Sequence, residues 1–276
     1  MCEALQHEAV TISPAHESFE TAGTKLAEWA ERQPVKAPVF VMVDPYGVAG
    51  VPMTLLRRLL EIDRVEVLLT FMVRDTGRFI DEDNYEKPLT ELFGGDAWKE
   101  CAGDEYRDRR NECLLLKLQD VVRTDVAAWA TPFRVFEDER RTVLYYLVHL
   151  TNNDLGMREM KKAMVHQSGD MTFWPVTVRP PDQLALEVDE HKPYPSLQRR
   201  LAETYAGRTI SFLELLNEDY PDGVWLEPEY RWALDGMEKH SPASVSVTRN
   251  RVTQGGKPAT RGIQHPDSLT FPATES

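Results

Sequence analysis

The sequence predicts an α/β protein with a second, smaller domain at its C-terminal end. Residues 39–43 are five apolar residues in a row, and residues 65–73 are a second, mostly apolar run; both are typical of strands that are covered on both faces. Helical apolar spacing precedes the first run, over residues 17–32, and separates the two runs, over residues 52–62. Alternation of helix and strand with short connections indicates a parallel α/β sheet.

The other elements of this sheet domain follow from the same patterns. Residues 9–12 are a short β-type run, and residues 84–120 are polar and helical. Residues 142–150 form the next strand pattern, residues 155–166 a helix with a methionine stripe, and residues 173–178 a last strand. The alternation of strand and helix therefore extends well beyond the first two runs.

The composition then changes, so we expect the sheet domain to span residues 8–185. A Pro-containing linker is expected over residues 186–195. Three helical segments and a β-rich, Gly-containing end fill residues 196–272. Three short helices followed by a β-hairpin are the order of a winged-helix domain.

Composition limits the class of protein. The 276 residues include 32 Lys and Arg against 45 Asp and Glu, which gives a net charge of −13 and excludes a generally basic, nucleic-acid-coating protein. No apolar run approaches the roughly 20 residues of a membrane span. The first residues carry no secretory signal, and three scattered cysteines indicate neither a disulfide framework nor a zinc site. We therefore expect a reducing cytoplasm.

The charge is uneven, because the stretch from Lys239 to Arg261 has five basic residues and no acidic one. As the wing of a winged helix, this hairpin would lay Arg249, Arg251, Lys257 and Arg261 along a nucleic-acid backbone. The alternative is a solvated hairpin, since Lys and Arg also protect edge strands from pairing.

Asp44-Pro45-Tyr46-Gly47 ends the first buried strand, where ligands of open parallel sheets bind. Methyltransferases that act on exocyclic amines place an acidic or amide residue, a proline and an aromatic residue there. Asp44 would accept hydrogen bonds from the amine, and Tyr46 would stack on a base held out of its helix. Asp44 and Tyr46 are thus candidate catalytic residues, with Pro45 and Gly47 beside the substrate.

Structural interpretations of these residues remain open. A strand that ends in Asp-Pro-x-Gly also makes a tight turn, and only Pro45 separates the acid from the aromatic residue, where methyltransferases usually have two residues. Arg74 and Arg78 follow the next strand and would bind a phosphate or carboxylate, or form a solvated loop. The seven histidines show no metal-ligand spacing, so no metal site is expected, and His149 fits a hydrogen-bonded strand histidine.

A series of segments resembles one known family, the three-Cys-motif partner proteins (TcmP). The similarity centres on Asp-Pro-Phe/Tyr-Gly, here Asp44 to Gly47, and covers nearly the whole chain. The segments that carry it are residues 40–47, 66–72, 78–79, 92–94, 98, 145–151, 156–157, 160–161 and 230–234.

The resemblance implies a Rossmann-like, methyltransferase-type sheet with a helical C-terminal extension. It also implies a partner protein with a three-cysteine motif that resembles radical-SAM proteins; the cysteines of this chain are not that motif. The chain departs from the family in one place. The family has a Gly-rich loop for S-adenosylmethionine far ahead of its Asp-Pro segment, whereas the 43 residues before Asp44 contain one glycine, Gly23.

The donor half of the sheet is thus expected to be lost, separately encoded, or omitted by a misplaced start codon, and its absence would leave an open sheet edge able to pair with a second copy. We expect no cofactor on the isolated chain. The first hypothesis is a TcmP-like protein that acts with its partner. The second is one subunit of a split nucleic-acid methyltransferase, with S-adenosylmethionine supplied in trans. The third is a nucleic-acid-binding module that uses the C-terminal hairpin.

Overall fold

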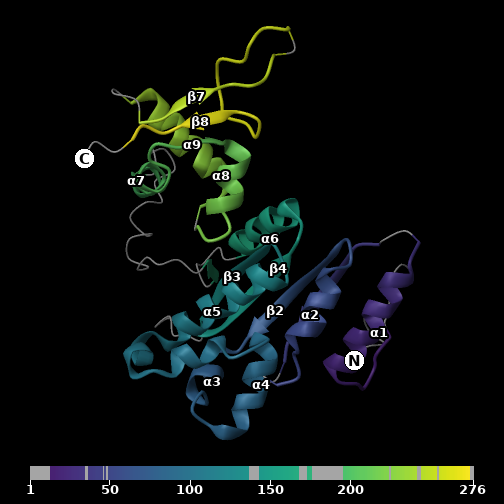
Figure 1. The fold of residues 1–276 in the computed structure, drawn as a ribbon. Coiled ribbons are helices and arrows are strands. Elements are labelled where there is room, and N and C mark those ends of the chain that lie inside the picture. The colour runs from purple at the N-terminus through teal and green to yellow at the C-terminus, as the bar shows by residue number, and fades with distance from the viewer. Residues whose placement is uncertain are drawn as a thin grey trace. The chain divides into compact units, whose positions relative to one another are not determined.

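The computed structural model describes residues 13–34, 37–45, 47, 49–136, 143–167, 173–175, 195–223, 225–240, 244–253 and 255–273. It is a mixed α/β structure, as the sequence predicts. The chain divides into two compact units (Figure 1). The first takes the chain up to Ala130 together with Val135–Gly156, and the second takes Thr131–Arg134 and the chain from Met157 onward.

The sheet of the first unit is mixed. Strands β1 (Val39–Val43) and β2 (Val65–Phe71) pair in parallel, which confirms the two apolar runs as neighbouring strands. Strand β4 (Val143–Thr151), however, pairs antiparallel to β2, so the expectation of a parallel sheet is wrong beyond β2. The expectation of cover on both faces holds for β2 but is wrong for β1, whose Phe40 and Met42 are exposed because β1 lies at the edge of the described sheet. An apolar run also carries no information on strand direction. Within the first unit the strands lie in the order β1-β2-β4.

Strand β3 (Trp129–Phe136) is one of the elements that the sequence patterns missed, with helix α3 (Val73–Arg78) and strand β6 (Thr209–Ser211). Strand β3 contains Pro132, and a proline argues against a strand assignment because it cannot donate to the ladder. Strand β5 (Phe173–Pro175) is the described part of the strand expected over residues 173–178. The run over residues 9–12 lies outside the described residues.

The helices of the first unit bury their apolar faces against the sheet and against one another. Helix α2 buries Leu55, Leu56 and Leu59, and a Cβ at Gly23 of α1 would stand 2.9 Å from Leu55, so α1 approaches α2 closely at that glycine. The helices are α1 (Phe19–Arg32), α2 (Met53–Leu60), α3 (Val73–Arg78), α4 (Asp83–Phe93), η2 (Ala97–Ala102), η3 (Asp104–Arg109) and α5 (Arg110–Asp125).

A disulfide joins Cys101 of η2 to Cys113 of α5, so the expectation that the cysteines form no disulfide is wrong. Cys101 is fully buried and Cys113 is 8% exposed. The packing of η2 on α5 brings the two Cα atoms to 5.7 Å, within the range that a disulfide spans. An odd number of cysteines with no recognisable spacing does not reveal this proximity.

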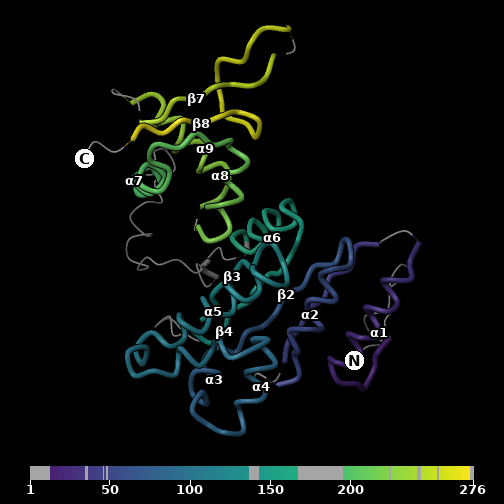
Figure 2. The backbone as a smooth tube through the Cα atoms, in the orientation of Figure 1, coloured from purple at the N-terminus to yellow at the C-terminus, as the bar shows by residue number. Residues whose placement is uncertain are grey.

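The second unit alternates helices and short strands before a long hairpin. Its three-stranded sheet is antiparallel and has the order β6-β8-β7. Figure 2 follows the chain out of β7 and back to β8, and we call residues 249–267 the wing. The second unit begins within α6 (Asp154–Gln167), at Met157. Its other elements are α7 (Pro195–Thr204), β6 (Thr209–Ser211), α8 (Phe212–Asp219), α9 (Glu227–Lys239), β7 (Ser246–Thr248) and β8 (Ser268–Thr270).

A buried polar network lies in the core of the second unit. Arg200 donates to Asp219 over 2.9 Å, and the hydroxyl of Tyr230 donates to the same carboxylate over 2.6 Å. Lys161 is fully buried, donates to the backbone oxygen of Tyr220, and has its Nζ 3.8 Å from the centre of the Tyr220 ring. Burial lowers the pKa of Lys161 to about 7.

Candidate functional site

A cavity of about 810 Å³ opens at the carboxyl ends of β1 and β2. Asp44, Pro45 and Gly47 line it, directly after β1, and Asp75 lines it from the segment after β2. The carboxyl ends of two parallel strands share one edge of the sheet, so the fold itself brings these two carboxylates to one cavity. Two carboxylates and an open cavity favour a ligand that donates hydrogen bonds.

Aromatic rings form another wall of this cavity, which we call the Asp44 pocket. The rings of Phe79 and Tyr85 are stacked, with centroids 4.7 Å apart and an angle of 15° between their planes. The guanidinium carbon of Arg78 lies 5.0 Å from the centroid of Phe79. Tyr145 of β4 adds a further ring. The pocket therefore offers flat apolar faces beside hydrogen-bond acceptors, the combination that holds a planar heterocycle.

The tight-turn interpretation of the Asp-Pro-x-Gly segment can be compared with the structure only at Gly47, because Tyr46 lies outside the described residues. Gly47 has a φ of +90°, which glycine adopts without the strain of other residues. Asp44 directly follows β1, is exposed, and lines the pocket. The end of β1 thus positions the carboxylate.

The other residues expected at this site have different outcomes. Tyr46 lies outside the described residues. Arg74 and Arg78 are exposed, and neither lines the pocket. The sequence did not point to Asn84 or Tyr85 as pocket residues, because both lie in a polar helical stretch whose neighbours in space depend on how α4 returns to the sheet.

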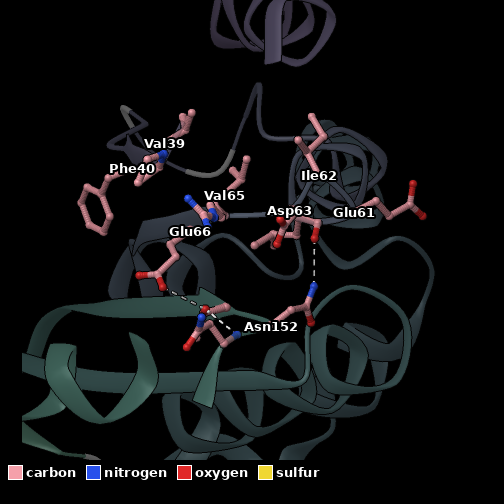
Figure 3. Close-up of a pocket in the computed structure, with 13 residues that line it drawn as sticks. Val39, Phe40, Glu61, Ile62, Asp63, Val65, Glu66 and Asn152 are labelled. Atoms are coloured by element: carbon pink, nitrogen blue, oxygen red, sulfur yellow. Dashed lines mark hydrogen bonds between the residues drawn. The ribbon is translucent and has the colours of Figure 1, made fainter. Parts of the chain in front are cut away.

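A second cavity, of about 830 Å³, lies at the opposite edge of β1 and β2 (Figure 3). Glu66 lines it and accepts hydrogen bonds from Thr151 at 3.3 Å, with the Nε2 atom of His149 3.1 Å away. The hydrogen bond with His149 lowers the pKa of Glu66. Asn152 donates to the backbone oxygen of Leu60 across this edge.

His149 matches its expected role as a strand histidine. It is fully buried in β4 and bonded to Glu66, while its Nδ1 atom has no hydrogen-bond partner. A Cβ at Gly156 would collide with the carboxylate of Glu66, so a larger residue there would displace this carboxylate from its hydrogen bonds. Within the ranges that the structure describes, no group of three or more His, Cys, Asp or Glu residues could hold a metal ion.

Two arginines expected to contact nucleic acid instead hold the base of the wing. Arg249 donates to both carboxylate oxygens of Glu238, at 2.8 and 2.6 Å. Arg251 donates to Asp267 at 3.1 Å and to the backbone oxygen of Gly262 at 2.8 Å. Glu238 and Asp267 lie outside the basic stretch of residues 239–261, so its composition does not reveal these pairs.

The other two wing residues have a different environment. The side chains of Lys257 and Arg261 are exposed. A hydrogen bond from the backbone N–H of Thr253 to the backbone oxygen of Lys257, at 2.8 Å, closes the hairpin beside Lys257. Of the four residues expected to contact phosphates, Lys257 and Arg261 are thus the two with side chains available at the wing surface.

No helix within the described part of the chain is long and apolar enough to cross a membrane. No protein-family model matches this chain, and no similar protein was found among the curated proteins or the solved structures. The function must therefore be argued from the geometry of the chain itself.

Proposed function

We propose that the first unit binds a planar nitrogen heterocycle that carries an exocyclic amine. The observation that carries this proposal is the position of Asp44 at the mouth of a pocket whose walls include the stacked Phe79 and Tyr85 rings. The carboxylate accepts the hydrogens of the amine, and the rings contact the flat faces of the base. Adenine and cytosine have this chemistry, whereas thymine has no exocyclic amine.

The wider proposal is the one that the TcmP resemblance implies: the first unit is the acceptor half of a Rossmann-like, methyltransferase-type protein and acts with a three-Cys-motif, radical-SAM-like partner. This proposal is supported by the parallel strands β1 and β2, which α2 connects, and by the position of the pocket at the carboxyl ends of both strands. Among the described strands β1 ends the sheet order, and its Phe40 and Met42 are 52% and 61% exposed. Apolar side chains on an edge strand favour docking of a second protein or copy.

S-adenosylmethionine has no place on this chain in the proposal. The resemblance implies that the donor binds to a Gly-rich loop. The lining of the Asp44 pocket, in contrast, includes one glycine, Gly47, and two carboxylates, Asp44 and Asp75. We therefore assign the donor to the second protein, as in a split methyltransferase, and Asp44 and Tyr46 to the acceptor base. The proposed location is the cytoplasm, where the Cys101–Cys113 bond would be exposed to reduction.

The test of the site is nucleoside binding to the full chain by ligand-observed NMR, with Asp44→Ala and Asp44→Asn variants. Wild type is expected to bind adenosine and cytidine at least about tenfold more tightly than thymidine, because one charge-assisted hydrogen bond contributes about 1.5–3 kcal/mol. Asp44→Ala should remove this preference, and Asp44→Asn should retain part of it, since the amide oxygen still accepts. Asp44 is exposed, so neither variant disturbs the core.

An equal affinity of wild type for adenosine, cytidine and thymidine would contradict the proposed role of Asp44. If Tyr85→Ala lost all nucleoside binding while Asp44→Ala bound nucleosides as wild type does, the stacked rings of Phe79 and Tyr85 alone would form the binding site. Lys87→Gln, at an exposed position of α4, is the control for changes that do not touch the pocket.

The second unit supports a second candidate function, binding of nucleic acid through a winged helix. Its order of helix, strand, helix, helix, strand, strand, with β8 between β6 and β7, is the order of a winged-helix domain. Helix α9 would repel the phosphates of a nucleic acid, because its four acidic residues outnumber its two basic ones. The contact would therefore depend on Lys257 and Arg261 of the wing.

Replacement of Lys257 and Arg261 by glutamine is expected to weaken binding of a DNA duplex and to reduce the slope of log affinity against log salt by about two, one for each phosphate contact. Fluorescence anisotropy at several salt concentrations measures this slope. The matched control is Lys87→Gln in the first unit, which should leave the slope unchanged. An unchanged slope in the wing variant would exclude the wing as the contact surface.

A further inference from the structure

The described lining of the Asp44 pocket carries two negative charges and no positive one. Asp44 and Asp75 line the cavity, and the other described residues that line it are uncharged. Within the described ranges, neither of these two carboxylates has a hydrogen-bond or ion-pair partner. The lining therefore attracts a cation, and none of its described side chains competes with that cation.

The two arginines that flank Asp75 in the sequence lie outside this lining. Arg74 and Arg78 are exposed, and neither lines the cavity. A ligand in the pocket lies against the two carboxylates, whereas water and salt screen the exposed guanidinium groups from it. Because the Coulomb energy falls with distance, the carboxylates have the larger effect on such a ligand.

The aromatic rings of the pocket favour a cation whose charge is spread over a flat ring. Phe79 and Tyr85 are stacked with their centroids 4.7 Å apart, and Tyr145 adds a third ring. The face of an aromatic ring attracts positive charge, and the guanidinium carbon of Arg78 lies 5.0 Å from the centroid of Phe79 in a contact of this kind. A flat cation gains this attraction together with a stacking contact, whereas a compact ammonium ion has no flat face to stack.

We propose that the Asp44 pocket binds a positively charged heterocycle, such as a base that is alkylated on a ring nitrogen, more tightly than the corresponding neutral base. This inference rests on the proposed function, because it concerns the same pocket, and it specifies the charge of the ligand. In an adenine that is methylated at N1, the ring and the exocyclic amine share the positive charge. The amine then donates charge-assisted hydrogen bonds to the carboxylate of Asp44.

Asp75 has a separate role in this proposal, as the residue that determines the preference for a charged base. It lies in α3, after β2, whereas Asp44 follows β1, so the two carboxylates approach a ligand from two neighbouring strands. One carboxylate is sufficient to accept the hydrogens of an amine. The second adds mainly electrostatic attraction, which a neutral base does not experience in full.

Two isomers provide the test, 1-methyladenosine and 2-methyladenosine. The first is positively charged at neutral pH and the second is neutral, while both keep the ring system, one added methyl group and the exocyclic amine. Titrated into the full chain by calorimetry at low salt, 1-methyladenosine is expected to bind at least about tenfold more tightly. The preference should decrease as salt is added, because screening weakens the attraction. Putrescine, a cation without a ring, is expected to bind more weakly than 1-methyladenosine.

Asp75→Asn tests the assignment, because it keeps the size of the side chain and removes one negative charge. We expect the preference for 1-methyladenosine over 2-methyladenosine to fall severalfold. An unchanged affinity for the neutral isomer would show that the pocket is intact. Asp108→Asn is the matched control, at an exposed position of η3 that does not line the pocket, and should keep the full preference.

Three results would overturn the inference: equal affinities of wild type for the two isomers, an affinity for putrescine equal to that for 1-methyladenosine, or an unchanged preference in Asp75→Asn. Equal affinities for adenosine and thymidine, with the preference between the isomers intact, would contradict only the proposed recognition of the amine. Absence of binding by every nucleoside would overturn both proposals.

Discussion

Replacement of Lys161 by methionine is expected to remove most of the rise in unfolding free energy that the second unit shows between pH 7 and pH 9. Lys161 is fully buried, and this burial lowers its pKa to about 7. In the unfolded chain the pKa returns to about 10.4. Methionine has a similar length and no charge, so it preserves the packing and removes the titration.

The direction of the effect follows from proton binding. Between pH 7 and about pH 10 the unfolded chain holds a proton on Lys161 and the folded chain does not, so stability rises with pH. With the pKa at about 7, the rise between pH 7 and pH 9 amounts to about 2 kcal/mol. Burial raises the pKa values of Tyr205, Tyr220 and Tyr230, so these groups do not titrate within this window.

The unfolding free energy is measured by urea denaturation at pH 7, 8 and 9. Amide hydrogen exchange in α8 serves as the signal from the second unit. Lys162→Met is the matched control, because Lys162 is the exposed neighbour on the same helix. The control should retain the full pH dependence of wild type. If wild type and Lys161→Met show the same pH dependence, then Lys161 is charged in the folded protein at pH 7 to 9.

Reduction of the Cys101–Cys113 disulfide is expected to destabilise the first unit by about 3 kcal/mol. The bond closes a loop between cysteines 12 positions apart, and the loss of this closure increases the conformational entropy of the unfolded chain. Both residues are buried in the contact of η2 with α5, so the folded state changes little.

The measurement compares urea midpoints of oxidised protein, reduced protein and a Cys101→Ala/Cys113→Ala variant. Reduced protein and the double variant should unfold at a similar, lower urea concentration. Cys2→Ser is the control, since this third cysteine belongs to no described disulfide. Three free thiols in native protein isolated without reductant would show that the bond does not form.

The elements that the sequence predicted are those whose signal is local. Strands β1 and β2 are mostly apolar runs, and helix α2 shows apolar residues at helical spacing. Strand β3 was hidden by Pro132, and the antiparallel direction of β4 depends on how the chain returns to the sheet. Neither feature has a local signature.

The candidate sites show the same division between local and distant information. The sequence pointed to Asp44, Pro45 and Gly47 because strand ends are recognisable, and the structure places all three in one pocket. It missed Phe79 and Tyr85 as a platform, since their stacking is a tertiary contact. The sequence analysis counted Arg249 and Arg251 as charges available to nucleic acid, although Glu238 and Asp267 pair with them in the folded chain.

The central claim is that Asp44 recognises the exocyclic amine of a base, and one comparison tests it most directly. The affinity of the full chain for adenosine is measured against that for N6,N6-dimethyladenosine, which keeps the ring system but has no amine hydrogen to donate. We expect wild type to prefer adenosine by at least about tenfold and Asp44→Ala to show no preference. An equal affinity of wild type for the two nucleosides would contradict the claim.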